Sequence, residues 1–280
     1  MTDTLARALG HAIQESFGQP VIVENKPGAQ GTLAAAMVAQ SKPDGHTLLV
    51  GSSVMFVAKS LYKALSYDPI GSFQPVSGIG STSMLFMVAD ASPIRTIADL
   101  TKAVQGEPAP VTIGFGSPSA QVALALFSAV TRSNPVPVGY RGTPQALTDL
   151  AGGHVQVAIV DIGNGMSQMD ATRMRPIVIS AASRYSALPD VPTLQETFPD
   201  ASGTLETIVA IMAPTGTPAA VVERLDTAIR AALARPEVQA RFGLMHTSVM
   251  PLSPVQLARR IADDNPRWEA LIRKAGIEPQ

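Results

Sequence analysis

Apolar and polar positions alternate along the first fifty residues with a spacing that changes from helical to extended and back. Residues 4–17 carry apolar side chains on one helical face, which predicts an amphipathic helix. The short β-branched run at 20–24 predicts a buried strand, residues 32–40 a helix and residues 46–51 a further strand. This order of strand, helix and strand predicts a parallel sheet covered by helices.

The same alternation returns in the rest of the chain. Strands are predicted at 111–114, 136–140, 155–160, 175–182 and 208–213. Helices are predicted at 120–130, 145–151, 219–234, 236–242, 254–263 and 266–275, and Pro144 stands where the first residue of a helix often does. With 280 residues the chain is long for a single hydrophobic core. We therefore expect two α/β lobes of ordinary size.

Charge and composition narrow the kinds of partner. The formal net charge is −1 and no run of like charges reaches five residues, so neither nucleic acid nor an anionic membrane surface is an expected partner. The chain has no cysteine, which excludes thiol nucleophiles, cysteine-ligated metals and disulfides. No stretch approaches eighteen uninterrupted apolar residues, so no membrane-spanning helix is predicted. The expected partner is a small molecule or another protein.

No group of residues predicts catalysis, a metal or a cofactor. The histidines lie far from other ligand types, at positions 11, 46, 154 and 246. A nucleophile elbow, a Walker A loop and a glycine-rich dinucleotide fingerprint are all absent from the sequence. Trp268 is the only tryptophan, and its place in an amphipathic helix favours packing over recognition. We therefore predict no enzymatic activity.

One type of loop recurs where predicted strands lead into helices. Small or hydroxyl residues follow the strands at 51–53, 116–119 and 141–143. Ligands of parallel sheets bind at the carboxyl ends of strands, and the free N–H groups of a helix start favour an anion. Arg141 is the candidate cationic partner for the anion, and Asp161 is a candidate partner for an amine or a water-bridged polar group. The alternatives are helix N-capping for the small residues, a solvated arginine, and Asp161 capping a turn at 163–165.

Several segments, in order along the chain, carry a resemblance to a known family. They are 18–29 (GQPVIVENKPGA), 43–49 (PDGHTLL), 67–69 (YDP), 73–76 (FQPV), 140–150 (YRGTPQALTDL), 187–193 (ALPDVPT) and 213–218 (APTGTP). Together they resemble the periplasmic solute-binding receptors of tripartite tricarboxylate transporters, also called Bug-type receptors. The resemblance runs from residue 2 to the C-terminus.

The resemblance implies a two-lobed α/β periplasmic-binding-protein fold of type II, a venus flytrap whose lobes close on a ligand. Lobe 1 would comprise residues 1–88 and 213–280, and lobe 2 residues 92–205. The hinge would lie near 87–91 and 211–214. The ligand would be a small carboxylate, such as a di- or tricarboxylate, an acidic amino acid or an aromatic acid.

The resemblance also implies the site and the partners. Ligand contacts are expected from two groups of residues, which are Thr2, Asp3, Ser52 and Ser53 in lobe 1, and Ser117, Ser119, Tyr140, Arg141, Gly142, Thr143, Asp161 and Gly163 in lobe 2. The protein would be a periplasmic monomer without a cofactor that hands its ligand to the membrane subunits of a transporter. A sensor that presents the closed form to a signalling partner is the alternative, and an α/β enzyme is the less favoured one.

This sequence departs from the family pattern at three places. Family members begin with an extra strand and a proline-rich, double-glycine loop that ends in a pair like Thr2-Asp3, whereas here the chain opens on a helix. The loop at 116–119 is shorter, and residues 206–208 replace a usual aromatic residue. We expect that the first central strand is missing, and that the nucleotides upstream of Met1 encode it in frame together with a signal peptide.

Overall fold

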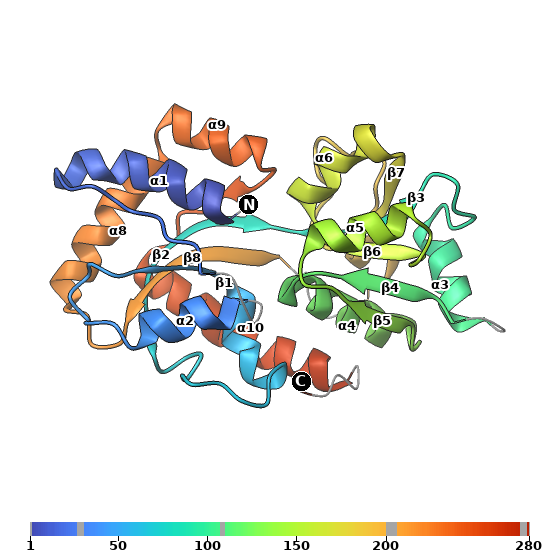
Figure 1. Ribbon diagram of the computed structural model, residues 1–280, viewed down its shortest axis with the longest axis horizontal. Coiled ribbons are helices and arrows are strands. Elements are labelled where there is room, and N and C mark those ends of the chain that lie inside the picture. Colours follow the sequence, from blue (N-terminus) through green and yellow to red (C-terminus); the bar gives the residue numbers. More distant parts are fainter. Residues whose placement is uncertain (1, 27–30, 107–109, 200–205, 275–278, 280) are drawn as a thin grey trace. The chain divides into compact units, whose positions relative to one another are not determined.

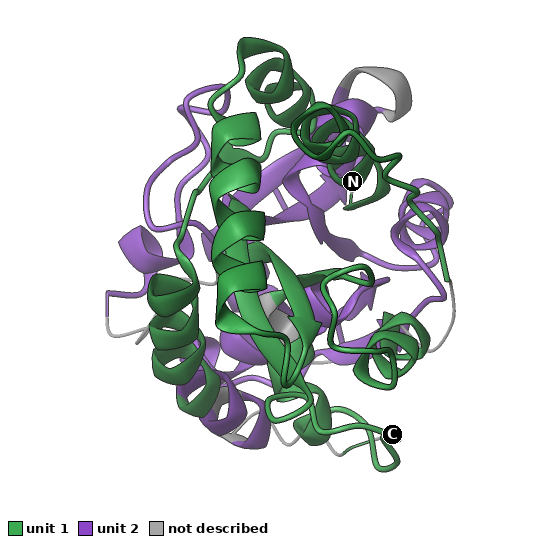
Figure 2. Cartoon of the chain, turned by 90° about the vertical axis from the view of Figure 1, so that its left-hand side faces the viewer, with its two compact units in different colours: residues 1–81, 207–266, 279–280 green, residues 82–206, 267–278 purple. Residues whose placement is uncertain are grey.

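The chain forms two compact units in the computed structural model, which describes residues 2–26, 31–106, 110–199, 206–274 and 279. Figure 1 shows the order of helices and strands, and Figure 2 colours the units. Unit 1 comprises Met1–Ser81, Thr207–Pro266 and Pro279–Gln280, and unit 2 comprises Thr82–Glu206 and Arg267–Glu278.

The boundaries between the units differ from the expected ones. Strand β2 (Phe73–Thr82) is followed, after Ser83, by strand β3 (Met84–Ala89), so the chain enters unit 2 at Thr82. It returns to unit 1 at the start of strand β8 (Thr207–Pro214). The expected hinge ranges, 87–91 and 211–214, therefore fall at the ends of β3 and β8, each inside one unit.

Unit 1 is built on a four-stranded sheet with the order β1-β8-β2-β9. Strand β1 (Leu49–Ser52) pairs antiparallel with β8, and β2 pairs antiparallel with β9 (Ser248–Val249). The parallel sheet expected from the alternation is therefore wrong for these pairs. Of the two strands that the predicted crossover would have joined, β1 lies instead beside β8, which comes from the distant segment after residue 206.

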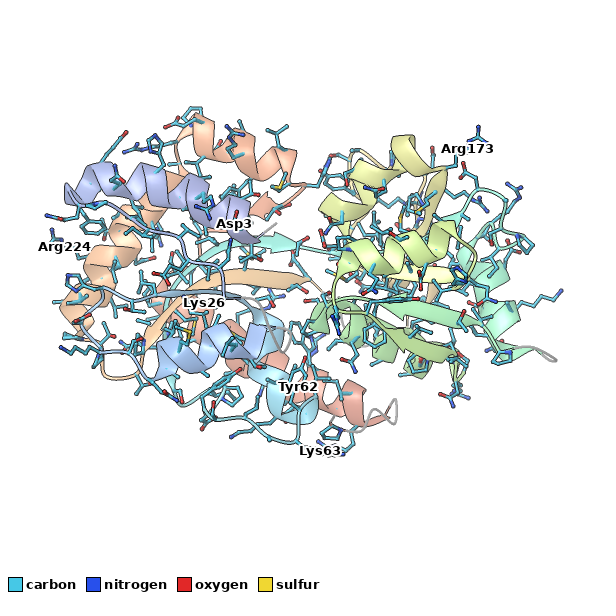
Figure 3. All side chains as sticks on the ribbon, in the orientation of Figure 1. Asp3, Lys26, Tyr62, Lys63, Arg173 and Arg224 are labelled. Atoms are coloured by element: carbon cyan, nitrogen blue, oxygen red, sulfur yellow. The ribbon has the colours of Figure 1, made fainter. Side chains whose placement is uncertain are left out.

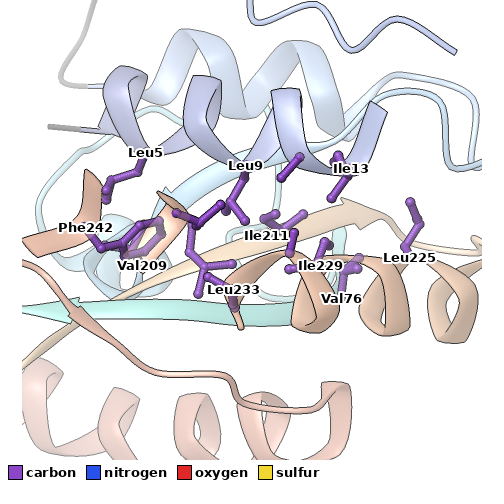
Figure 4. Packing of buried hydrophobic residues seen from close by; sticks show 14 of the residues in the cluster. Leu5, Leu9, Ile13, Val76, Val209, Ile211, Leu225, Ile229, Leu233 and Phe242 are labelled. Carbon is purple, nitrogen blue, oxygen red and sulfur yellow. The ribbon is translucent and has the colours of Figure 1, made fainter. Parts of the chain in front are cut away.

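Both faces of β8 are buried, which explains its continuous apolar sequence. Val209, Ile211 and Ala213 point to one core, where they meet helices α1 (Thr2–Phe17), α8 (Ala219–Leu233) and α9 (Pro236–Leu244). Figure 4 shows this packing, with side chains such as Leu9 and Ile229 facing each other across it. The alternate residues of β8 face a second core with helices α2 (Thr32–Ala39) and α10 (Pro254–Lys274).

The strand predicted at 20–24 is wrong. These residues have no regular structure, and Ile22 is 78% exposed. No strand in the part of unit 1 that the structure describes pairs with them, and Val21 packs instead beside Gly10 of α1. A β-branched run gains strand structure only through pairing, so the local preference alone did not decide its conformation. The loop expected after it falls mostly on residues 27–30, outside the described ranges.

Unit 2 contains a five-stranded sheet with the order β5-β4-β6-β3-β7. Strands β5 (Val136–Gly139), β4 (Thr112–Phe115) and β6 (Val157–Asp161) run parallel, as the alternation predicted. Strand β3 runs antiparallel between β6 and β7 (Met174–Ile179).

Helices cover both faces of this sheet. Leu85 and Met87 of β3 contribute to one core, whereas Phe86 points to the other face and meets Phe127 of helix α4 (Pro118–Thr131) edge to face at 5.5 Å. The remaining elements of the unit include α3 (Ile97–Gln105), α5 (Thr143–Ala151), α6 (Ile162–Thr172) and the short α7 (Leu194–Thr197). The 3₁₀ helix η2 (Ser53–Ser60) belongs to unit 1.

Two predicted breaks are helical in the structure. Residues 254–263 and 266–275 were expected as separate helices, but α10 continues through Pro266. An internal proline costs a helix about 3 kcal/mol, which the burial of Leu257, Ile261 and Trp268 along one stripe offsets.

The turn expected at 163–165 is the first turn of α6. Gly165 lies there because a Cβ atom would come within 2.7 Å of Leu85 Cδ1.

None of the helices that the structure describes combines the length and the apolar composition needed to cross a bilayer.

Candidate ligand-binding site

Three helices of unit 2 begin at the same edge of its sheet. Strand β4 lies between β5 and β6, with Phe115 opposite both Gly139 and Ile159, so the carboxyl ends of the three parallel strands lie side by side. Each strand leads within a few residues into α4, α5 or α6. The positive ends of three helix dipoles therefore meet at this edge, which is where parallel sheets bind anions.

Two of these helix starts are capped by their own side chains. The Ser117 hydroxyl accepts a hydrogen bond from the Ala120 amide at 3.3 Å, at the start of α4. Asp161 accepts from the Asn164 amide at 3.1 Å and from Asn164 Nδ2 at 2.6 Å, at the start of α6. N-capping, the alternative to ligand binding, is therefore present at both positions.

The third helix start, that of α5, has no side-chain cap because its N-cap residue is Gly142. Thr143 follows with only 8% of its surface exposed, and neither its amide nor its hydroxyl hydrogen-bonds to a residue that the structure describes. Arg141 precedes it, exposed and without an ion pair to any described residue. An amide, a hydroxyl and a guanidinium are thus available at one helix start, a donor set suited to a carboxylate.

The loops after β4 and β5 are in close contact. A Cβ atom on Gly116 would lie 2.2 Å from the Gly142 carbonyl carbon and 2.3 Å from Thr143 N. Backbone cannot retreat from such an approach as a flexible side chain can, so only glycine fits at 116. The short loop at 116–119 therefore lies directly against the start of α5.

Tyr140 is fixed at both its backbone and its side chain. Its amide donates to Phe115 O at 2.8 Å, and its hydroxyl donates to Asp149 Oδ2 at 2.7 Å, near the end of α5. Burial, followed by this hydrogen bond, raises the pKa of Tyr140 to about 12. The hydroxyl of this predicted ligand contact is thus engaged within unit 2.

The structure brings together all the residues predicted for lobe 2. Ser119 is the second residue of α4 and Gly163 the second residue of α6, so both accompany the caps described above.

The residues predicted for lobe 1 lie on two elements of unit 1. Ser52 ends β1, Ser53 begins η2, and Thr2 and Asp3 begin α1, where Figure 3 labels Asp3. Asp3 accepts hydrogen bonds from Arg7 Nε at 3.0 Å and from Asn25 Nδ2 at 2.7 Å. These bonds hold the pKa of Asp3 below its ordinary value.

The antiparallel strand β3 adds residues that the sequence pattern did not predict. Because Met84 lies opposite Asp161, the amino end of β3 falls at the same edge as the helix starts. Ser83 O accepts from the Ile162 amide at 3.0 Å, and the Ser180 hydroxyl accepts from the Met84 amide at 2.8 Å. Serines and threonines occupy 81–83, but only an antiparallel pairing with β6 would have placed them here, and the sequence pattern did not reveal that pairing.

The described residues contain no group of three His, Cys, Asp or Glu side chains placed to hold a metal ion.

Comparisons with known proteins agree with this architecture. Residues 5–277 match the family model described as "Tripartite tricarboxylate transporter family receptor". The chain is 32% identical to a UPF0065 protein of Bordetella bronchiseptica, over 99% of this chain and 82% of that protein. It is 29% identical to Protein BugT of Bordetella pertussis, over 99% of this chain and 86% of that protein.

Solved structures give the same result. The periplasmic binding protein BugD is similar with a TM-score of 0.87 and 28% identity, covering 100% of this chain and 94% of the other. R. palustris Rpa4515 with adipate gives a TM-score of 0.89 and 27% identity, covering 99% and 94%. MatC from Rhodopseudomonas palustris with bound malate gives 0.86 and 29%, covering 97% and 94%. The α/β periplasmic-binding-protein fold expected from the sequence is therefore confirmed, and the chain belongs to the tripartite tricarboxylate transporter family of receptors.

Proposed function

We propose that this chain is a periplasmic solute-binding protein that captures a small carboxylate, performs no chemistry on it, and delivers it to the membrane subunits of a tripartite tricarboxylate transporter. The uncapped start of α5 carries the proposal. There the Thr143 amide and hydroxyl and the Arg141 guanidinium have no partner among the described residues. A carboxylate could accept hydrogen bonds from all three of these groups, and bonds between charged groups are among the stronger kinds.

The free energy available from these interactions is sufficient for a solute-binding receptor. A partly buried helix start stabilises an anion by up to about 2 kcal/mol, and each hydrogen bond to a charged group adds about 1.5–3 kcal/mol. The adipate and malate described in the two R. palustris structures are both dicarboxylates. We propose that one carboxylate of the ligand binds at the start of α5.

Isothermal titration calorimetry against a panel of carboxylates tests this function. The panel contains malate, adipate, citrate, glutamate and benzoate, and adipamide serves as the matched neutral control. We expect at least one carboxylate to bind, adipamide not to bind, and the ligand to be recovered unchanged after incubation with the protein. A panel without a binder, or conversion of the bound compound, would overturn the proposal.

Delivery to a transporter is tested separately. The ligand-loaded protein, immobilised, should retain the membrane subunits of the transporter from detergent-solubilised membranes of its own source. Retention of a membrane-bound signalling protein in their place would support the sensor instead.

A further inference from the structure

The start of α5 is connected to the end of the same helix by one side-chain hydrogen bond. Tyr140 lies immediately before Arg141, and its hydroxyl reaches Asp149 Oδ2, in the last turn of α5, at 2.7 Å. The bond therefore runs alongside the helix and joins its entry to its exit.

The tyrosine ring has little freedom to move. A Cβ atom on Gly114 would lie 3.0 Å from Tyr140 Cε2, so the ring rests against the backbone of β4. The Tyr140 amide is also bound to Phe115 O. With its backbone, ring and hydroxyl all held, Tyr140 fixes the chain at the residue from which the loop 141–143 departs.

Asp149 is anchored as well. Its backbone carbonyl accepts hydrogen bonds from the His154 amide at 2.9 Å and the Val155 amide at 3.5 Å, which tie the end of α5 to the approach to β6. The carboxylate of Asp149 has no cation paired with it among the described residues, and the Tyr140 hydroxyl is the side-chain donor it receives. A hydrogen bond from a neutral hydroxyl to a charged carboxylate is one of the stronger kinds.

From this geometry we infer that Tyr140 and Asp149 are a positioning pair that orients the open donors of α5 toward the ligand carboxylate, and that the Tyr140 hydroxyl itself does not contact the ligand. The inference rests on the proposed function. A donor set held rigid before binding loses less conformational entropy when the ligand arrives, so the pair raises affinity without touching the ligand. Because the pKa of Tyr140 is raised, its hydroxyl keeps its proton at every pH at which the protein would be assayed.

Three variants isolate the pair. Tyr140→Phe keeps the ring and removes the hydrogen bond, Asp149→Leu removes the acceptor, and Asp149→Asn keeps an acceptor oxygen. We expect the first two to lower the affinity for the carboxylate that the wild-type protein binds by about tenfold each, the equivalent of one hydrogen bond. Asp149→Asn should restore most of the affinity. Tyr67→Phe, which removes a hydroxyl in the core of unit 1, is the matched control and should bind as the wild type does.

Amide hydrogen exchange of the ligand-free protein supplies a readout that does not depend on the ligand. Exchange of the Gln145 and Ala146 amides should accelerate in Tyr140→Phe, while the amides of α4 stay unchanged. Unaltered exchange in α5, or Tyr140→Phe affinity equal to that of the wild type, would overturn the positioning role. A wild-type protein that binds no carboxylate would instead overturn the proposed function, whatever the exchange shows. Uniformly faster exchange in all helices of unit 2 of Tyr140→Phe would also overturn the positioning role, because the pair would then stabilise the whole unit and not the start of α5 in particular.

Discussion

At the scale of single residues, the sequence predicted where donors gather but not which of them are open. Ser117, Asp161 and Gly142 all precede helices, and from the sequence each could bind a ligand or cap its own helix. The structure separates them through rotamer geometry, since the side chains of Ser117 and Asp161 turn back onto their helices. Glycine cannot do so. Gly142, which has no side chain, therefore leaves the start of α5 open to a ligand.

Arg141 provides the most direct test at this scale. Arg141→Ala should weaken carboxylate binding by about 1.5–3 kcal/mol in titration calorimetry, the range for a hydrogen bond to a charged group. Arg132→Gly removes the same charge from unit 2 at a position with positive φ, where glycine is free of strain, and should leave the affinity unchanged. Equal affinities for Arg141→Ala and the wild type would assign Arg141 to the solvated alternative.

Gly116 tests the contact between the two loops. Gly116→Ala inserts a methyl group against the backbone of Gly142 and Thr143, so the start of α5 has to shift. We expect a loss of about 1–3 kcal/mol in the free energy of unfolding, measured with urea, together with weaker carboxylate binding. Gly153→Ala is an unsuitable control because of its positive φ, whereas Gly243→Ala has open space and should be neutral or stabilising. Wild-type stability in Gly116→Ala would show that the loops separate readily.

At the scale of elements, the sequence predicted where several helices begin more closely than it predicted which strands pair. The helices of the second half of unit 1 begin at the predicted residues, because amphipathic spacing and prolines at helix starts are local properties. The run at 20–24 has strand composition but no partner, and β3 and β7 gained their positions from pairings across many residues. The order of strands in a sheet depends on pairing between distant segments, and the local sequence of a single chain contains little information about that pairing.

At Pro266, packing keeps a helix continuous where the local sequence predicts that it ends. Pro266→Ala restores the missing amide inside α10 and should raise the free energy of unfolding by up to about 3 kcal/mol in urea denaturation. The matched control is Pro254→Ala at the first residue of the same helix, where a proline costs little and the change should be small. A decrease in stability for Pro266→Ala would mean that packing of the proline ring outweighs the hydrogen bond it removes.

At the scale of the whole molecule, the sequence predicted two α/β units, and the family resemblance supplied their interleaved order along the chain. The residues at which the chain passes from one unit to the other could not be predicted from the sequence. Only one residue separates β2 from β3, so no loop marks the boundary. The chain also passes from unit 1 to unit 2 within α10, after Pro266. Because this boundary lies inside a continuous helix, no change in amino-acid composition marks it.

The last prediction concerns how a bound carboxylate stabilises the two units. Trp268 is the only tryptophan, is 2% exposed and belongs to unit 2, so its fluorescence reports the unfolding of that unit. Far-ultraviolet circular dichroism reports the helices of both. A ligand at 100 times its dissociation constant stabilises whatever it binds by about 2.7 kcal/mol. We expect the fluorescence transition to move to higher denaturant by that amount, because the proposed site at the start of α5 belongs to unit 2. A fluorescence transition that a saturating carboxylate leaves unchanged would contradict binding at the start of α5.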